Sequence, residues 1–340
     1  MDLRLNSEQE QLVESFASLL DKHSTPERVR AFESTGFDPE LWAQLCTAGI
    51  VEMAVPEADG GWGASLLDLA LVAEQVGRTV ASAPVIEAQV AARLLARIGT
   101  EQARSLLTAV LAGEQLVTIA LHPAKDGTAA LVPAAPIADV VLVLDGDRLL
   151  GASPAGSVAV ENLGSMALAD VSIASGTQIA SGAAATASFQ AGIDEWLALT
   201  GSALGSIGAR ALEIGVEYVK ERNAFGVPIG SFQAISHRLA DSAAALDGSQ
   251  LLSREAAWAH ADDADRFAEL AAMSFAYAYE SARDATYRSL HFHGGYGFMM
   301  EYDVQLYYRR ARAWANVYAE PAIVYRRAAD ARFGPVAVAG

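Results

Sequence analysis

Two segments in the C-terminal part of the chain combine residue types that bind phosphate groups. The first runs from Arg222 to His237 and reads RNAFGVPIGSFQAISH. Its arginine can form two parallel hydrogen bonds with a phosphate, and its Gly/Pro-rich turn leaves backbone N–H groups free for an anion. The simpler interpretation is an ordinary connection between helices, with Phe225 and Phe232 packed inward. Composition alone favours that interpretation, because short Gly/Pro loops are common.

The second segment is rich in glycine and reads HFHGGYGFMME from His291 to Glu301. The glycines at 294, 295 and 297 would let the backbone approach a ligand closely, as phosphate sites require. A glycine triplet is not specific by itself. His291 and His293 are two residues apart and do not share a helix face, and no His/Asp cluster lies near them. The sequence therefore predicts no metal site.

The elements that must position these segments fall into three parts. Residues 1–112 show helical spacing of apolar residues, beginning with a cap at Asn6. Residues 113–190 contain short β-rich runs, with a hairpin signal at Asp145-Gly146-Asp147 and no confident strand in the later Ala/Ser/Gly-rich part. Residues 191–340 again have helical stripes, which indicates a four-helix bundle. Within it, we expect one helix to end near Arg222 and the next to begin at Gln233.

Composition excludes several classes of protein. The chain has 340 residues with 24 Lys+Arg against 41 Asp+Glu, a net charge of −17, and a single cysteine, Cys46. This acidity argues against general nucleic-acid binding, and one cysteine excludes an internal disulfide. The N-terminus lacks the apolar core of a signal peptide, and the charge-free stretch 171–193 is too polar to span a membrane. We therefore expect a cytoplasmic protein.

Both segments resemble the acyl-CoA dehydrogenase family. The family's run Arg-x-x-Phe-Gly-x-Pro-Ile-x-x-Phe-Gln-x-x-x-His-x-Leu-Ala-Asp stands here at 222–241, and its Gly-Gly-x-Gly-Phe-x-x-Glu turn at 294–301. The N-terminal part matches in Val-Pro-Glu at 55–57 with glycines at 60, 61 and 63, and in Glu-x-x-Gly-Arg at 74–78. The likeness covers almost the whole chain and is weakest at about 122–195.

The resemblance implies an N-terminal helical domain, a small middle β-domain and a C-terminal four-helix bundle. It also implies bound FAD between the β-domain and a bundle at a dimer contact, α,β-desaturation of an acyl-CoA substrate, and electron-transfer flavoprotein or a similar acceptor. The positions that match the family's flavin contacts are Arg222, Phe225, Gln233, His291, Gly294, Gly295 and Gly297. An arginine and open backbone N–H groups can both donate hydrogen bonds to a diphosphate, and they can neutralise its charge inside an otherwise acidic protein.

The catalytic base departs from the family pattern. Many relatives place a glutamate nine residues after the arginine that matches Arg309, and here that position is Tyr318. A tyrosine is a poor base for an α-proton because its ordinary pKa is about 10. Glu320 would serve only after a two-residue shift and is better explained as a capping or surface carboxylate. The alternative family location would need a carboxylate near Glu195, which we expect at a helix entrance, where acids favour the helix dipole.

The β-domain also departs from the pattern. The segment 120–127 lacks the Thr, Glu and Ser with which full-length relatives cradle the flavin ring, and His291 stands where many relatives have glutamine. The chain is therefore similar to the shorter, partly degenerate subunits that pair with a longer catalytic chain in two-plus-two assemblies acting on steroid-derived CoA thioesters. Two alternatives stay open: a self-sufficient homo-oligomeric dehydrogenase that uses Glu320 or Glu195, and a non-catalytic scaffold without cofactor.

Overall fold

A computed structural model describes residues 4–335, which divide into two compact units. One unit comprises the described residues up to Pro26, Ala70–Ala81 and the chain from Leu197 onward. The other comprises Glu27–Leu69 and Ser82–Trp196. The division falls inside three helices: after the first residue of α2 (Pro26–Ala31), and within α4 (Leu66–Arg78) and α7 (Ala183–Glu221). The predicted domain boundaries at 112/113 and 190/191 remain predictions.

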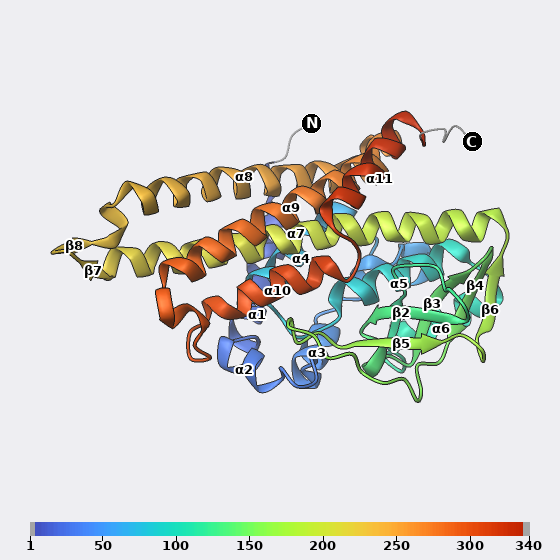
Figure 1. The fold of residues 1–340 in the computed structure, drawn as a ribbon. Coiled ribbons are helices and arrows are strands. Elements are labelled where there is room, and N and C mark those ends of the chain that lie inside the picture. The colour runs from blue at the N-terminus through green and yellow to red at the C-terminus, as the bar shows by residue number, and fades with distance from the viewer. Residues whose placement is uncertain (1–3, 336–340) are drawn as a thin grey trace. The chain divides into compact units, whose positions relative to one another are not determined.

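The first unit is helical and contains the bundle. Its N-terminal helix α1 begins where the sequence predicts, because Asn6 accepts from the Gln9 backbone N–H at 2.9 Å and Gln9 returns the bond at 3.2 Å. The helix α9 packs against α8, α10 and α11. Helices α7, α8 and α9 run side by side in Figure 1. The elements of this unit, besides the C-terminal parts of α4 and α7, are α1 (Ser7–His23), α8 (Gln233–Asp262), α9 (Ala264–Phe292), η5 (Gly294–Phe298), α10 (Val304–Asn316) and α11 (Pro321–Phe333).

The second unit combines helices with a small set of strands. Its helices, besides the N-terminal parts of α4 and α7, are α2 (Pro26–Ala31), α3 (Pro39–Thr47), η1 (Glu52–Ala54), η2 (Glu57–Asp59), α5 (Val85–Ile98), α6 (Glu101–Leu111) and η3 (Ala135–Ile137). Its strands are β1 (Val117–Ile119), β2 (Thr128–Pro133), β3 (Val140–Asp145), β4 (Arg148–Ala152), β5 (Leu168–Ser172) and β6 (Thr177–Ser181). One sheet has the order β1-β3-β4-β6, and β2 pairs separately with β5. Small apolar side chains fill the space under these strands, among them Ala129, Val141 and Val171.

The strand predictions are confirmed in the first half of this region and incomplete in the second. The hairpin at Asp145-Gly146-Asp147 joins β3 to β4, with Asp145 opposite Arg148 and Gly146 at a φ of +62°. The sequence gave no confident strand after it, yet β5 and β6 form there. Both pair with strands distant in the sequence, and these partners compensate for their weak local β-propensity.

The two helix boundaries predicted around the segment 222–237 are confirmed. Helix α7 ends at Glu221, one residue before Arg222, and α8 begins at Gln233. The predicted place of Glu195 at a helix entrance is wrong, because α7 begins at Ala183 and Glu195 lies well inside it. Its carboxylate is therefore too far from the helix start to interact with the N-terminal dipole.

Residues 4–335 contain neither a candidate membrane-spanning helix nor a candidate metal-ligand cluster. None of the helices there combines the length and apolar character that crossing a bilayer needs. Likewise, no group of three or more His, Cys, Asp or Glu side chains in this range is arranged to hold a metal ion.

Candidate functional site

Arg222 and Phe225 lie on a short hairpin that connects α7 to α8. Strands β7 (Asn223–Ala224) and β8 (Val227–Pro228) pair antiparallel, and Phe225 and Gly226 form the turn at φ values of +54° and +85°. A two-residue turn with both φ values positive matches the twist of a β-hairpin, although a phenylalanine rarely adopts this conformation. The hairpin is labelled at the far left of Figure 1.

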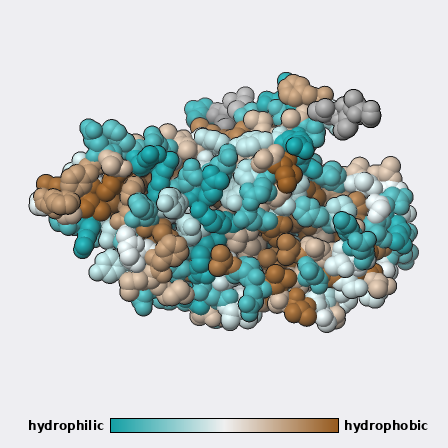
Figure 2. Space-filling model, viewed as in Figure 1, coloured by the Kyte–Doolittle hydropathy of each residue, from teal (hydrophilic) through white to brown (hydrophobic). Residues whose placement is uncertain are grey.

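The two phenylalanines are not packed inward, so that part of the simpler interpretation is wrong, although the segment does connect two helices. Phe225 is 95% exposed, and its ring meets Phe232 edge to face at a centroid distance of 6.2 Å. Val227 beside it is also exposed, and Figure 2 shows the apolar tip at the left edge. Phe225, Val227 and Phe232 together form a small exposed apolar patch, and Phe225 adopts a strained backbone conformation within it.

The arginine of the hairpin is exposed and has its backbone fixed at both sides. The Arg222 N–H donates to Tyr218 O at 2.9 Å, and its carbonyl accepts from Ile229 N at 2.8 Å. Among the residues that the structure describes, its guanidinium has no carboxylate partner. Arg222 is therefore available to an anionic ligand.

The glycine turn after α9 divides into an open part and a packed part. A Cβ built on Gly294 or Gly295 would meet nothing within 4 Å, and Gly294 has a φ of +61°. A Cβ on Gly297 would lie 2.3 Å from Leu290 O, so this glycine has a packing reason of its own. Gly294 and Gly295 are thus the positions where bare backbone faces open space, as a phosphate site requires.

A buried histidine joins the hairpin to the glycine turn. His293 stacks on Tyr218 with ring centroids 4.0 Å apart, and Tyr218 is one helical turn before Arg222. The His293 Nδ1 is 2.7 Å from Ser289 O, and burial holds its pKa below the usual range. Arg222 and Gly294 therefore belong to the same end of the bundle, which the motifs alone did not establish. Helical spacing could have indicated Tyr218, whereas nothing local in the sequence indicates its contact with His293.

His291 and the start of α8 meet in a pocket of about 470 Å³. His291 is exposed and stacks on Tyr287 at 5.9 Å, and Ala234 beside Gln233 lines the opposite side. The other lining residues are Arg238, Asp284, Arg288 and Phe292. Sequence reasoning missed both arginines, because they are 50 positions apart and only the pairing of α8 with α9 brings them together.

The two weak candidates for a catalytic base have different surroundings. Glu320 is exposed at the N-cap position of α11 and makes no capping hydrogen bond through its side chain. Glu195 is fully buried, and its Oε1 is 3.0 Å from the Arg93 guanidinium and also accepts from Arg97. Two arginines that hold one carboxylate form an internal ion pair, which fits a structural role.

The position of the family's usual base is occupied by an aromatic contact. Tyr318 is half-buried and packs edge to face on Phe275, with centroids 5.9 Å apart. The side chain at this position is therefore a phenol and not a carboxylate. In the described residues, the motif-matched position therefore provides no base for an α-proton.

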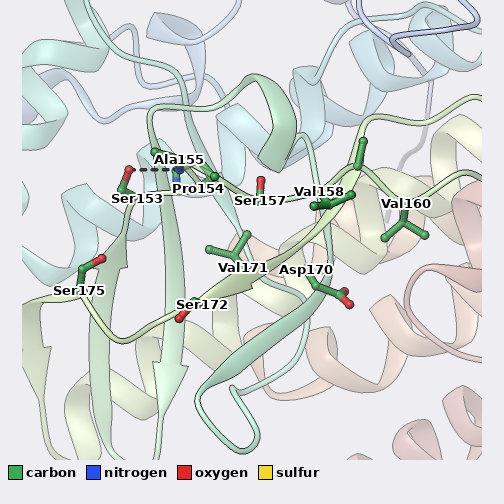
Figure 3. Close-up of a pocket in the computed structure, with 12 residues that line it drawn as sticks. Ser153, Pro154, Ala155, Ser157, Val158, Val160, Asp170, Val171, Ser172 and Ser175 are labelled. Carbon is green, nitrogen blue, oxygen red and sulfur yellow. Dashed lines mark hydrogen bonds between the residues drawn. The ribbon is translucent and has the colours of Figure 1, made fainter.

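The strand region offers a second pocket without cationic side chains. It has a volume of about 500 Å³ and is lined by small apolar and hydroxyl residues, including Ser153, Ser157 and Val171 (Figure 3). Asp170 at its edge accepts from Leu131 N at 2.7 Å. None of the twelve lining residues is Arg, Lys or His, so this pocket cannot neutralise a diphosphate.

The segment that should cradle a flavin ring is short and closed onto the sheet. Ala120 N donates to Leu142 O at 2.9 Å, and Ala124 N donates to Leu144 O at 2.7 Å. A tight turn then follows, because Lys125 and Thr128 form a bridge to each other. In the described residues, the candidate phosphate-binding groups that the sequence predicts lie at the bundle end and not in this segment.

Comparisons with known proteins agree with these features. The family model for the acyl-CoA dehydrogenase N-terminal domain matches residues 6–114, and that for the C-terminal domain matches residues 194–316. Acyl-CoA dehydrogenase IpdE2 of Mycolicibacterium smegmatis is 32% identical over 95% of this chain and 98% of its own length. Acyl-CoA dehydrogenase FadE27 of Mycobacterium tuberculosis is 31% identical, over 87% and 89%.

Two solved structures of steroid or two-chain enzymes are also similar. The ChsE4-ChsE5 complex from Mycobacterium tuberculosis contains a chain with a TM-score of 0.89 and 25% identity, covering 99% of this chain and all of that one. A variant of the Tcur3481-Tcur3483 steroid ACAD gives a TM-score of 0.87 and 26% identity, covering 96% and 97%. Members of the matched family are FAD-dependent oxidoreductases. With both family models matched and a relative aligned along nearly its full length, the chain belongs to the acyl-CoA dehydrogenase family.

Proposed function

We propose that this chain is the shorter subunit of a hetero-oligomeric, FAD-dependent acyl-CoA dehydrogenase in the cytoplasm. In this assembly its bundle end completes the flavin site of a longer catalytic chain. The observation that carries the proposal is a contrast: the positions that match flavin contacts are present and, apart from the buried Gly297, exposed, whereas the usual base position holds Tyr318.

The residues at the bundle end fit the diphosphate of FAD. Arg222 supplies an exposed guanidinium without a carboxylate partner among the described residues, and Gly294 and Gly295 present open backbone. These are the donors that bind a diphosphate in place of water. Phe225 projects beyond the chain's own surface, as a contact with a neighbouring subunit would require.

The reaction divides between the chains. In α,β-desaturation a carboxylate base removes the α-proton of the thioester, and bound flavin supplies the acceptor for the hydride from the β-carbon. Electron-transfer flavoprotein or a similar acceptor then takes the two electrons. We assign the base to the longer chain, and to this chain the binding and orientation of the cofactor through Arg222, Phe225, Gln233, His291 and the glycine turn.

The similarity to the ChsE4-ChsE5 and Tcur3481-Tcur3483 proteins supports a two-chain assembly and a steroid-derived CoA thioester as substrate. The self-sufficient alternative would need Glu320 or Glu195, but one is an exposed residue at a helix start and the other is buried between two arginines. The scaffold alternative gives no reason for the strained, exposed Phe225.

Flavin absorbance tests this proposal. The chain is purified alone and after co-expression with a longer relative from the same genome, and the 450 nm absorbance per protein is compared. We expect a colourless lone chain and a yellow complex of both chains. A yellow lone chain that oxidises an acyl-CoA would contradict the proposal, and a colourless pair would favour the scaffold.

The variant Arg222→Ala tests the placement of the flavin diphosphate within that complex. A hydrogen bond to a charged group contributes about 1.5–3 kcal/mol, so we expect FAD affinity to fall roughly ten- to hundredfold. Arg326→Gln, an exposed arginine on α11, is the control and should leave flavin content unchanged. Unchanged flavin content in Arg222→Ala would refute this role.

A further inference from the structure

Four aromatic side chains form a continuous series of ring contacts beside the glycine turn that follows α9. Tyr218 stacks on His293 with ring centroids 4.0 Å apart, and His293 meets Tyr302 edge to face at 6.1 Å. The Tyr302 ring also lies 5.4 Å from the ring of Tyr296, which belongs to the turn itself. Aromatic rings in stacked or edge-to-face contact attract each other. This ring chain therefore connects α7, the end of α9, η5 and the segment before α10.

The two open glycines cannot fix their own position, because they have no side chains with which to make contacts. A Cβ at Gly294 or Gly295 would meet nothing within 4 Å. Their backbone is held from both sides by the ring chain, since His293 precedes them and Tyr296 follows them. The His293 ring is buried and donates from Nδ1 to Ser289 O at 2.7 Å, which fixes its orientation at the end of α9.

The same ring chain relates the turn to the arginine of the hairpin. Tyr218 lies in the last turn of α7, and its carbonyl accepts from the Arg222 backbone N–H at 2.9 Å. The turn continues from α9, so its place relative to Arg222 depends on contacts between two different helices. The stack of Tyr218 on His293 is such a contact, and it lies next to both groups.

We propose that the ring chain is a positioning device that holds Gly294 and Gly295 at a fixed place relative to Arg222. Its inner rings act through the turn and not by contact with the cofactor. The inference rests on the proposed function for the ligand that the turn receives, whereas the rigidity of the turn is a property of this chain alone. The contacts use the faces and edges of the rings, so phenylalanine can replace either inner tyrosine.

Hydrogen–deuterium exchange of the full chain alone tests the rigidity of the turn. Tyr218→Leu should make the amides of residues 294–298 exchange about fivefold faster, because it removes one aromatic contact. Tyr302→Leu should have the same effect, and it keeps the test decisive if Tyr218→Leu does not fold. Tyr218→Phe keeps the ring and should exchange within about twofold of the wild type.

The control is Tyr325→Leu, which removes a tyrosine on α11 that does not belong to the ring chain. Exchange of residues 294–298 in this variant should equal that of the wild type. Unchanged exchange in both leucine variants at positions 218 and 302 overturns the inference. Exchange that is as fast in Tyr218→Phe as in Tyr218→Leu also overturns it, because the ring would then not be the group that holds the turn.

The FAD affinity of the co-expressed complex tests the consequence for the site. Measured well below the melting temperature of every variant, it should fall roughly fivefold in Tyr218→Leu and in Tyr302→Leu. Phenylalanine at either position should restore it to within about twofold, which a loss of stability alone would not explain. Because both rings act on one turn, the combined leucine variant should lose less than the product of the single losses. A loss equal to the full product would overturn a common action through the turn.

These outcomes separate the inference from the proposed function. If no complex forms, the hetero-oligomer proposal fails, while faster exchange in the leucine variants and its rescue by phenylalanine still support the ring chain. If a yellow complex forms and its FAD affinity is the same in all variants, the hetero-oligomer proposal stands and the positioning role fails.

Discussion

At the scale of single residues, the proposed cofactor contacts differ in their surroundings from the candidate bases. Arg222 and the backbone at Gly294 and Gly295 are open to a ligand. Of the carboxylates near the expected base positions, Glu195 is held inside by two arginines and Glu320 faces solvent. A subunit whose partner removes the α-proton needs groups that bind the cofactor and does not need a base of its own.

The variant Glu320→Gln tests that separation. Because the side chain is exposed and makes no capping hydrogen bond, we expect turnover of the complex to stay within about twofold of the wild type. Removal of a true general base costs roughly 10²–10⁴-fold. Steady-state desaturation of an acyl-CoA measures the difference, and a loss on that scale would make Glu320 the base.

The histidine that joins the two phosphate-binding segments predicts a pH dependence of stability. Burial lowers the pKa of His293 in the folded chain, while in the unfolded chain it titrates near 6.5. As the pH falls below about 6.5, the unfolded chain therefore binds the proton first, and the free energy of unfolding decreases.

His293→Gln should reduce this loss, because glutamine can donate to Ser289 O without titrating. Denaturant unfolding at pH 7.5 and 5.5 measures it, and the wild type should lose more stability than the variant over this interval. An equal loss in both proteins would show that other groups determine the acid response.

At the scale of elements, the turn after α9 assigns different tasks to glycines that look equivalent in the sequence. Gly295 faces open space at an ordinary φ, whereas Gly297 lies against the Leu290 carbonyl. The glycine that is open to a ligand and the glycine that is required for packing are thus two residues apart. The hairpin between α7 and α8 makes a similar division, with its backbone fixed and its aromatic tip exposed.

Two alanine substitutions distinguish these tasks. Gly297→Ala should destabilise the fold by about 2 kcal/mol or more, because its Cβ would overlap Leu290 O and the backbone would have to move. Gly295→Ala should leave the free energy of unfolding within about 0.5 kcal/mol and lower the flavin content of the complex. Thermal unfolding and flavin absorbance test the pair, and normal flavin content in Gly295→Ala would remove this glycine from the cofactor site.

At the scale of the whole molecule, a strongly acidic chain has three arginines without an acid partner around the hairpin and the α8–α9 pocket. Arg222, Arg238 and Arg288 have no carboxylate partner among the described residues, and all lie on α8, α9 or the hairpin before α8. The exposed Phe225 lies at the same hairpin. Positive charge with an exposed aromatic is what the proposed function requires of a surface for an anionic cofactor and a partner chain.

Phe225→Ala tests that surface. Because the ring is 95% exposed, the stability of the lone chain should change by no more than about 0.5 kcal/mol. A central aromatic at an interface typically contributes about 2 kcal/mol or more, so we expect the affinity for the longer chain to fall roughly thirtyfold. Sedimentation measures the affinity, with Phe333→Ala, another exposed aromatic, as the control. Equal affinities in all three proteins would contradict a contact through Phe225.

The sequence by itself determined the features that depend on neighbouring residues. It predicted the cap at Asn6 and the turn at Asp145-Gly146-Asp147. It also predicted the end of α7 before Arg222 and the start of α8 at Gln233. Capping and turn formation need only a few consecutive side chains. The motifs at 222–241 and 294–301 were enough to indicate the family.

The tertiary structure decided the features that join distant segments. Strands β5 and β6 acquire their hydrogen bonds from β2 and β4, so their own Ala/Ser-rich sequences did not predict them. The ion pair of Glu195 with Arg93 and the pocket shared by Arg238 and Arg288 exist only because separate helices pack together. The physical reason is that a side chain's burial and charge partners depend on residues far along the chain, which neighbouring residues in the sequence do not reveal.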